Sequence, residues 1–273
     1  MASLELTSVR SPRVKSARRL AKRSFRQQDR RFLAEGPQAV REALALEGGL
    51  VELYATAEAE SRHADLIGRA EKAGVQVLRV SGEVMAELAQ TVTPQGLLAV
   101  CAFLDVPLGV ALRGSPQLVT VLSHVRDPGN AGTVLRASDA AGADSVIFTD
   151  ASVDPYNGKC VRASAGSLFH LPLVTGPRFD TLIPLLKEAG LTVLAADGAG
   201  EHTLDDLQDS GALARPTAWV FGNEAWGLPE EILRHVDDVV RVPIHGKAES
   251  LNLATAAAVC LYASARSQRA AVS

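Results

Sequence analysis

Three segments in the second half of the chain combine glycines with polar side chains that could bind a ligand. They run from His124 to Arg136, from Trp219 to Pro229 and from Val242 to Leu253. Glycine lets another group approach the backbone closely, and Asn or Ser can cap a helix or bind a ligand. These segments are therefore the first candidates for an active site.

The first segment predicts a helix start beside a cation. Asn130 suits the N-cap, and Val134 and Leu135 belong to the inward stripe of the helix. Arg136 then lies on a flank with small neighbours, where a ligand could reach its guanidinium. A capped helix with an exposed arginine is the alternative. A dinucleotide-binding loop is excluded, because GxGxxG is absent.

The second segment places a glycine directly after an apolar strand. Gly222 would let backbone atoms contact a flat ligand, and Glu224 could hold a hydroxyl-bearing or cationic group. The alternative is a βα turn with a solvated acid, in which Pro229 starts the next helix. Trp226 is either a stacking surface or a core residue, and the sequence pattern does not distinguish between these two roles.

The third segment leads into an alanine-rich helix whose small residues permit close packing or threading. Ser250 suits its N-cap. Asn252 would need partners if buried, so it either ties down the loop or binds a ligand. His245 is more typical of a loop histidine than of a catalyst, since the sequence offers it no partner.

The first hundred residues alternate between strand and helix patterns. Strands are expected at 31–35, 50–56, 75–80 and 97–104, and helices at 36–46, 58–73 and 81–90. This alternation predicts a small α/β domain over residues 1–104. Residues 105–116 contain two prolines and two glycines without a sustained period, which predicts a linker.

Residues 117–273 form the second expected domain. Apolar runs occur at 118–122, 145–149, 191–196, 218–221 and 239–242, and helical patterns at 131–141, 179–189, 229–236 and 250–267. Such runs are typical of strands buried on both faces, which predicts an α/β fold with a mostly parallel sheet. Ligands of such sheets bind beyond the carboxyl ends of the strands.

Positive charge is concentrated near the N-terminus. Residues 10–31 contain 10 Lys and Arg and one acid, whereas the remainder has 18 basic and 30 acidic residues, so a +9 segment adjoins a −12 body. Val14, Ala17 and Leu20 recur at helical spacing after Ser11-Pro12, which predicts an anchored helix with exposed cations. This helix would bind a polyanion in a salt-dependent manner. A solvated tail or an ordinary charged helix face is the alternative.

Composition limits the class of protein. The 273 residues are 47% hydrophobic and 22% charged, which suits one large or two ordinary folded domains. No stretch approaches the roughly 20 apolar residues of a membrane span, and no secretory signal is evident, so a cytoplasmic protein is expected. Cys101, Cys160 and Cys260 lack CxxC or Cys/His ligand spacing, so neither a disulfide framework nor a metal site is predicted.

In order and spacing, the three segments resemble the three motifs of the SpoU/TrmH-type RNA ribose methyltransferases of the SPOUT superfamily. The matching residues are Asn130, Gly132, Arg136, Gly222, Glu224, Gly227, Leu228, Pro243, Ser250, Leu251 and Asn252. Residues 154–159 and 161–166 are also similar to that family. The basic lead and residues 32–36 resemble the ribosomal-protein-like RNA-binding domain often fused to it.

The resemblance implies a trefoil-knot methyltransferase domain, a homodimer, and transfer of a methyl group from S-adenosylmethionine to a ribose 2′-hydroxyl of ribosomal or transfer RNA. The implied catalytic group is Arg136, Asn130, Glu224, Ser250 and Asn252. The implied cofactor-binding residues are Val220, Phe221, Gly222, Gly227, Val242, Ile244, Leu251 and Leu253. The basic side chains expected to contact RNA are Arg10, Arg13, Lys15, Arg18, Arg19, Lys22, Arg23 and Arg162.

The family assigns activation of the hydroxyl to the arginine that matches Arg136. Free arginine keeps its proton in water up to about pH 12 and is a poor base at neutral pH. Arg136 is therefore either a strongly perturbed base or a clamp for a phosphate and the developing oxyanion. The sequence departs from the family at Asp127, usually Asn, and at the bulky pair Ala225-Trp226, which would alter substrate fit rather than reaction type.

Two other classes of protein would show different residues at these positions. A non-catalytic RNA-binding protein on a methyltransferase-like scaffold would have lost residues such as Asn130 or Arg136, and both are present. A nicotinamide-dependent oxidoreductase would show GxGxxG with an acid about 20 residues later, and that pattern is missing.

Overall fold

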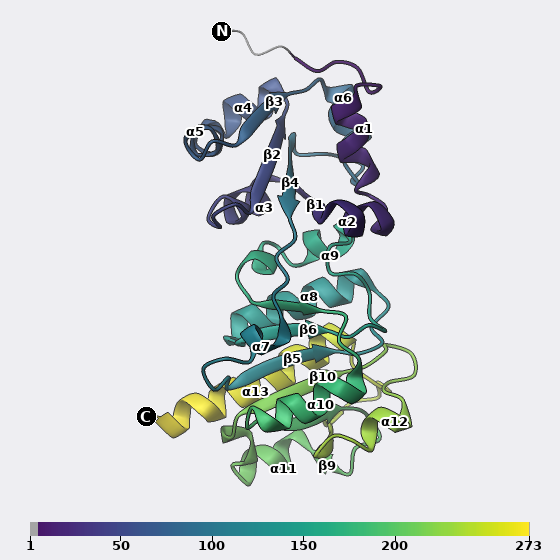
Figure 1. The fold of residues 1–273 in the computed structure, drawn as a ribbon. Coiled ribbons are helices and arrows are strands. Elements are labelled where there is room, and N and C mark those ends of the chain that lie inside the picture. Colours follow the sequence, from purple (N-terminus) through teal and green to yellow (C-terminus); the bar gives the residue numbers. More distant parts are fainter. Residues whose placement is uncertain (1–4, 273) are drawn as a thin grey trace. The chain divides into compact units, whose positions relative to one another are not determined.

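The computed structural model describes residues 5–272 and divides the chain into two compact units (Figure 1). Unit 1 runs to Leu104 and also includes Tyr156–Phe169, whereas unit 2 holds Asp105–Pro155 and the residues from His170 onward. The expected division at residues 104 and 116 differs from this in two respects. Residues 156–169 pack with unit 1, and the expected linker packs with unit 2.

Aromatic stacking accounts for the first difference. Tyr156 stacks on Phe103 with ring centroids 3.9 Å apart and lies 4.8 Å from the ring of Phe32. Apolar burial accounts for the second. Helix α7 (Leu108–Ala111) lies inside the expected linker, and Ala111 is buried in the core of unit 2.

Unit 1 is built on a four-stranded sheet with the order β1-β4-β2-β3. Its strands are β1 (Arg31–Glu35), β2 (Leu50–Ala55), β3 (Gln76–Arg79) and β4 (Leu97–Ala102). β4 is antiparallel to β1 and β2, while β2 and β3 are parallel. Each strand lies where the sequence predicts one, within two residues at either end.

The helices of unit 1 cover this sheet and its ends. They are α1 (Pro12–Arg19), α2 (Arg23–Asp29), α3 (Pro37–Ala43), α4 (Ala57–Arg62), α5 (Ala64–Lys72), α6 (Gly82–Leu88) and α9 (Gly158–Ala163). The single helix expected over 58–73 is interrupted at His63, whose backbone leaves the helical region (φ −122°, ψ 40°). The anchored basic helix is confirmed, because α1 buries Val14 and Ala17, and Leu20 follows them into the core.

Unit 2 contains a seven-stranded sheet with the order β7-β6-β5-β10-β8-β11-β9. Its strands are β5 (Leu118–Leu122), β6 (Ser145–Phe148), β7 (Leu173–Thr175), β8 (Thr192–Ala196), β9 (His202–Thr203), β10 (Thr217–Phe221) and β11 (Asp238–Arg241). Every neighbouring pair is parallel. The predicted parallel sheet is confirmed, and the short edge strands β7 and β9 are additions to it.

Helices lie on both faces of this sheet. They are α8 (Pro128–Ala141), α10 (Phe179–Glu188), α11 (Leu204–Asp209), α12 (Glu230–Leu233) and α13 (Leu253–Val272). On one face, Val121 and Val220 pack into the same cluster as Leu182 of α10. On the other face, Trp219 donates a hydrogen bond from its indole N–H to Ser264 of α13.

Candidate active site

The three motif segments leave the sheet at the same edge. β5 pairs with β10, β10 with β8 and β8 with β11, all in parallel, so their carboxyl ends meet. The segments after β5, β10 and β11 are those singled out from the sequence. The loop after β8 joins them, because it also contributes to the cavity at this edge.

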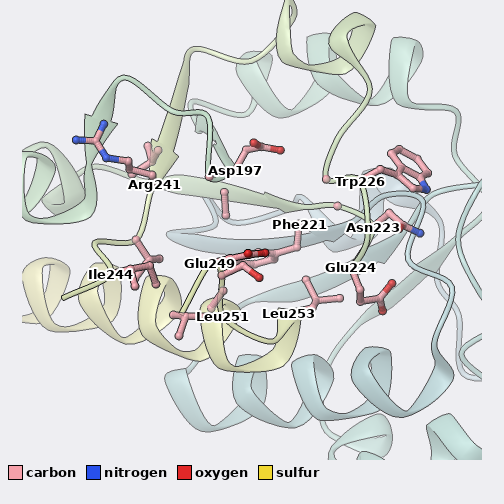
Figure 2. Close-up of a pocket in the computed structure, with 18 of the residues that line it drawn as sticks. Asp197, Phe221, Asn223, Glu224, Trp226, Arg241, Ile244, Glu249, Leu251 and Leu253 are labelled. Carbon is pink, nitrogen blue, oxygen red and sulfur yellow. The ribbon is translucent and has the colours of Figure 1, made fainter. Parts of the chain in front are cut away.

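A cavity of about 500 Å³ lies among these loops (Figure 2). It is lined by seven of the eight residues expected to bind a cofactor: Phe221, Gly222, Gly227, Val242, Ile244, Leu251 and Leu253. The eighth, Val220, does not line it and lies fully buried in the sheet core. Ser250 and Glu224 of the expected catalytic group line the cavity as well.

Glycines permit the tight turn after β10. Asn223 and Gly227 exchange backbone hydrogen bonds of 2.8 and 3.0 Å, which closes residues 223–227 into a turn. A Cβ on Gly222 would lie 2.6 Å from the Gly227 carbonyl oxygen, and Gly227 itself has φ +70° against the Asp197 carboxylate. Gly222, which was predicted to admit a flat ligand, and Gly227 therefore allow these loops to pack against each other.

Side chains from all three motifs form a chain of hydrogen bonds. The Asn252 amide donates to Oδ1 of Asn130 at 3.1 Å, and the Asn130 amide donates to Oε1 of Glu224 at 3.2 Å. Asn130 is half-buried, and the other two are exposed. The structure thus brings together three residues of the expected catalytic group, and Glu224 connects them to the cavity.

Arg136 stands apart from this chain of hydrogen bonds. It is exposed on α8, as the helical pattern predicts, and its side chain makes no hydrogen bond or ion pair with the residues from 5 to 272. Its guanidinium is therefore open to a partner from outside the chain.

The helix starts differ from the two predicted caps. Asp127 precedes α8 and accepts a hydrogen bond from the Asn130 backbone N–H at 2.8 Å, so the predicted cap at Asn130 is wrong. Helix α13 begins at Leu253, and Asn252 rather than Ser250 accepts from the Ala254 N–H at 2.9 Å. The cap of α8 frees the Asn130 side chain for its contacts with the other two motifs.

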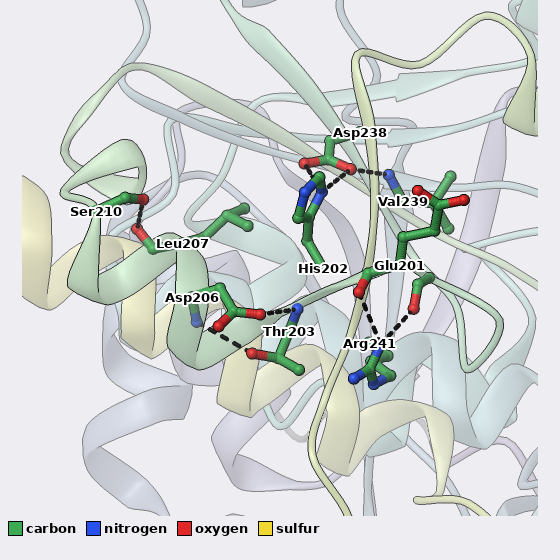
Figure 3. Close-up of polar contacts among 10 residues, drawn as sticks. Glu201, His202, Thr203, Asp206, Leu207, Ser210, Asp238, Val239 and Arg241 are labelled. Carbon is green, nitrogen blue, oxygen red and sulfur yellow. Dashed lines mark hydrogen bonds and ion pairs between the residues drawn. The ribbon is translucent and has the colours of Figure 1, made fainter.

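The loop after β8 is a wall of the cavity that the sequence did not single out. Asp197 lines the cavity and accepts hydrogen bonds from the N–H groups of Ala199 and Leu228 at 3.0 and 3.3 Å. Arg241 donates to the carbonyl oxygens of Gly200 and Glu201, both at 2.8 Å (Figure 3). The available signal was position, because Asp197 directly follows the carboxyl end of β8.

An ion pair lies next to this wall on the edge strand. His202 of β9 contacts the Asp238 carboxylate at 2.9 Å (Figure 3). The hydrogen bond from the imidazole to Asp238 raises the pKa of His202 above its usual 6.5. The contact links β9 to β11 as an exposed ion pair.

The eight predicted RNA-binding cations fall into two groups. Four have carboxylate partners within unit 1: Arg13 with Glu52, Arg18 with Glu87, Arg19 with Asp29 and Arg162 with Glu35. The other four, Arg10, Lys15, Lys22 and Arg23, are exposed and form no ion pair with the residues that the structure describes.

The described part of the chain lacks the features of a membrane span and of a metal site. Among residues 5–272, no helix combines the length and the apolar character needed to cross a membrane. Within the same range, no group of three or more His, Cys, Asp or Glu side chains is placed to hold a metal ion.

Solved structures that superpose on this chain include methyltransferases. The AdoMet-bound rRNA methyltransferase from Sinorhizobium meliloti superposes with a TM-score of 0.81 at 30% identity, covering 97% of this chain and 98% of that one. AviRb from Streptomyces viridochromogenes, in complex with the cofactor AdoMet, gives a TM-score of 0.80 at 26% identity, covering 96% and 100%. AdoMet is S-adenosylmethionine.

Sequence comparisons agree with the structures. The SpoU rRNA Methylase family matches residues 117–262, and the MRM3-like substrate binding domain matches residues 11–99. The 23S rRNA (guanosine(2553)-2'-O)-methyltransferase RlmP of Bacillus subtilis is 32% identical over 94% of this chain and 98% of its own length. RlmB of Bordetella pertussis, a 23S rRNA (guanosine-2'-O-)-methyltransferase, is 32% identical over 80% and 89%. The chain therefore belongs to the SpoU rRNA methylase family, which confirms the resemblance seen in its motifs.

Proposed function

We propose that this chain transfers the methyl group of S-adenosylmethionine to a ribose 2′-hydroxyl of ribosomal RNA. The observation that carries the proposal is the hydrogen-bonded chain Asn252–Asn130–Glu224, which joins the three motifs beside the cavity. Relatives that match 94% and 80% of this chain are named as 2′-O-methyltransferases of 23S rRNA.

The cavity fits the cofactor in size and in chemistry. Its volume of about 500 Å³ lies within the roughly 300–1,000 Å³ of small-ligand sites. Phe221, Ile244 and Leu253 give it an apolar surface for an adenosine group, while Asp197 and Glu249 add carboxylates that attract cations. The bound cofactor would supply an electrophilic methyl group on a positively charged sulfur and an ammonium group, both of which such carboxylates favour.

The residues of this chain have positioning and electrostatic tasks. Glu224, held by Asn130, would accept a hydrogen bond from the ribose and fix its orientation at the cavity. Arg136 is exposed on α8, and free arginine is a poor base at neutral pH. We therefore propose that it clamps a phosphate of the RNA and stabilises the developing oxyanion, rather than acting as the base.

Four further features belong to this proposal. We propose that residues 1–104 bind the RNA substrate, supported by the MRM3-like match and the exposed cations near α1. We also propose a knotted methyltransferase domain over 117–273, a homodimer, and action in the cytoplasm, where ribosomal RNA is available. Exposed Val259 and Tyr262 on α13 support a protein partner on that helix.

The test is methyl transfer from labelled cofactor. The protein is incubated with labelled S-adenosylmethionine and separated RNA fractions, and ribose methylation is mapped by resistance to alkaline cleavage. Label in ribosomal RNA supports the proposal, label in transfer RNA alone corrects the substrate, and no label in any RNA contradicts it. Arg136→Ala should lower turnover at least about 100-fold with cofactor affinity unchanged. Arg234→Ala replaces an exposed arginine outside the cavity lining and should leave both unchanged.

A further inference from the structure

Trp226 is a large apolar side chain left open at the edge of the cavity. It lines the cavity, yet 54% of its surface is exposed, whereas Phe221 and Leu253 of the same lining are 1% and 9% exposed. Figure 2 shows its indole beside Asn223, and its exposure places it at the rim of the cavity. An exposed large aromatic ring in a ligand site is a candidate contact surface for a ligand. Tryptophan is enriched at binding interfaces, where the ring becomes covered only when the partner binds.

The turn that carries Trp226 is closed on itself. Asn223 and Gly227 exchange two backbone hydrogen bonds across it, and the Asn223 side-chain oxygen accepts from the Ala225 N–H at 2.8 Å. The backbone beneath the indole is therefore fixed before any ligand binds. A preorganised ring loses little conformational freedom on binding.

His124 supports the indole from the end of β5. The two rings lie edge to face with centroids 5.5 Å apart and an interplanar angle of 71°. His124 is held from both sides, since its Nδ1 hydrogen-bonds to Ser123 Oγ at 3.0 Å and its carbonyl oxygen accepts from the Asn223 amide at 3.2 Å. It also has φ +61°, a left-handed conformation that non-glycine residues rarely adopt. One edge contact covers at most one face of the indole, so the other face remains available.

We propose that Trp226 is the stacking platform for the base of the nucleotide whose ribose is methylated. The inference rests on the proposed function and names the group that holds the target base. Glu224 is two residues away on the same turn, so a sugar at Glu224 and a base on Trp226 fit a single nucleotide. Arg126, exposed on the loop after His124, offers a cation for the adjoining phosphate. Because every base has a π face, this contact gives affinity and orientation rather than base identity.

The cofactor's adenine is the competing occupant of this surface. The interior of the cavity already offers buried Phe221 and Leu253 to that ring, whereas Trp226 faces solvent. The rings of Trp226 and His124 also carry no charge at neutral pH, because burial and nearby Arg126 lower the pKa of His124. An uncharged aromatic surface at the rim suits an unstacked RNA base.

Tryptophan fluorescence tests the proposal directly. The chain has two tryptophans, and Trp219 is fully buried with its N–H bonded to Ser264, so quenching by a ligand reports on Trp226. Purified ribosomal RNA added to the S-adenosylhomocysteine complex should quench the wild-type signal and leave Trp226→Phe unquenched. RNA that binds in a filter assay without quenching would overturn the inference, as would equal quenching by S-adenosylhomocysteine alone.

Kinetics separate stacking from folding. Trp226→Ala should raise the RNA KM about 10-fold, Trp226→Phe should restore it to within about 3-fold, and neither should alter affinity for S-adenosylhomocysteine. Leu185→Ala, an exposed leucine on α10 outside the cavity lining, is the matched control and should change nothing. An unchanged KM in Trp226→Ala contradicts the stacking role. Calorimetric binding of S-adenosylhomocysteine to the wild-type protein tests the proposed function independently, because it requires neither RNA nor Trp226.

Discussion

Asn130 is the residue through which the three motif loops contact one another. Its side-chain oxygen accepts from Asn252, its amide donates to Glu224, and its backbone N–H is satisfied by Asp127. An asparagine can do this because it carries a donor and an acceptor on one planar group. Aspartate at the same position would lack the donor and would face the Glu224 carboxylate with a like charge.

Replacing Asn130 with alanine should therefore reduce turnover more than it reduces binding. Loss of both hydrogen bonds leaves Glu224 without its support, and misplacement of a positioning group can cost about 100-fold in rate. We expect kcat to fall by this order while the Kd for S-adenosylhomocysteine changes less than about 3-fold. Thr133→Ala, one turn further along α8, removes only a local bond to the Gly129 carbonyl and is the control. Equal loss of rate in both variants would show a general effect on the helix.

His124 makes the free energy of unfolding depend on pH under mildly acidic conditions. Burial and, secondarily, Arg126 lower its pKa in the folded protein, while Asp150 opposes them. The unfolded chain, with an ordinary pKa near 6.5, then binds more protons than the folded chain, so stability is present above about pH 6.5 and is lost as pH falls through the lowered pKa. His124→Gln should remove this part of the pH dependence in urea unfolding, and an NMR titration should place the His124 midpoint below 6.5. A midpoint above 6.5 would contradict the packing described for its ring.

At the scale of elements, the start of α8 positions the first motif. Asp127 accepts the Asn130 N–H, and Pro128 occupies the first helical turn, where its missing N–H costs nothing. Asparagine, the usual family residue at this position, can accept the same bond. The departure from the family therefore preserves the cap.

A pair of substitutions checks this cap. Asp127→Ala should lower the free energy of unfolding by about 1 kcal/mol, whereas Asp127→Asn should change it by less than about 0.5 kcal/mol. Both are measured by urea denaturation at pH 7. Similar losses in the two variants would mean that the charge of Asp127, and not its capping bond, stabilises the helix.

The same segments show how far sequence could predict the elements and the site. β5 and β10 were predictable because parallel strands buried on both faces leave continuous apolar runs. β9 was not, since two residues cannot show a period. The cap at Asn130 was misplaced because Asp127 also suits an N-cap, and only the three-dimensional contacts with Glu224 distinguish the two residues.

Contacts between distant segments were the least predictable feature. Residues 156–169 follow the first motif in sequence, yet they pack in unit 1 through Tyr156, whose hydroxyl accepts a hydrogen bond from the Leu104 N–H at 2.8 Å. Asp197 was not predicted as a site residue for a similar reason. Its hydrogen bond from the Leu228 N–H depends on a loop that is distant in sequence. Periodicity carries no information about such pairings.

For the molecule as a whole, the ion pairs in the structure indicate which cations can bind RNA better than the separation of charge along the sequence does. Half of the predicted RNA-binding cations have carboxylate partners in unit 1, including Arg13 and Arg18 of α1. A cation paired in the free protein must exchange one partner for another on binding a phosphate. Lys15 and Lys22, which have no ion pair among residues 5–272, can add their full attraction to RNA.

The salt dependence of RNA binding distinguishes these two groups of cations. Each phosphate contact contributes about one unit to the slope of log K against log salt, so Lys15→Ala/Lys22→Ala should reduce the slope by about 2 and weaken binding similarly for different RNA sequences. Arg13→Ala/Arg18→Ala should reduce it by less than about 1, because Glu52 and Glu87 already neutralise those charges. Filter binding between 50 and 200 mM salt measures both slopes. A larger reduction from the arginine pair would mean that RNA displaces the carboxylates and that the ion pairs of α1 open on binding.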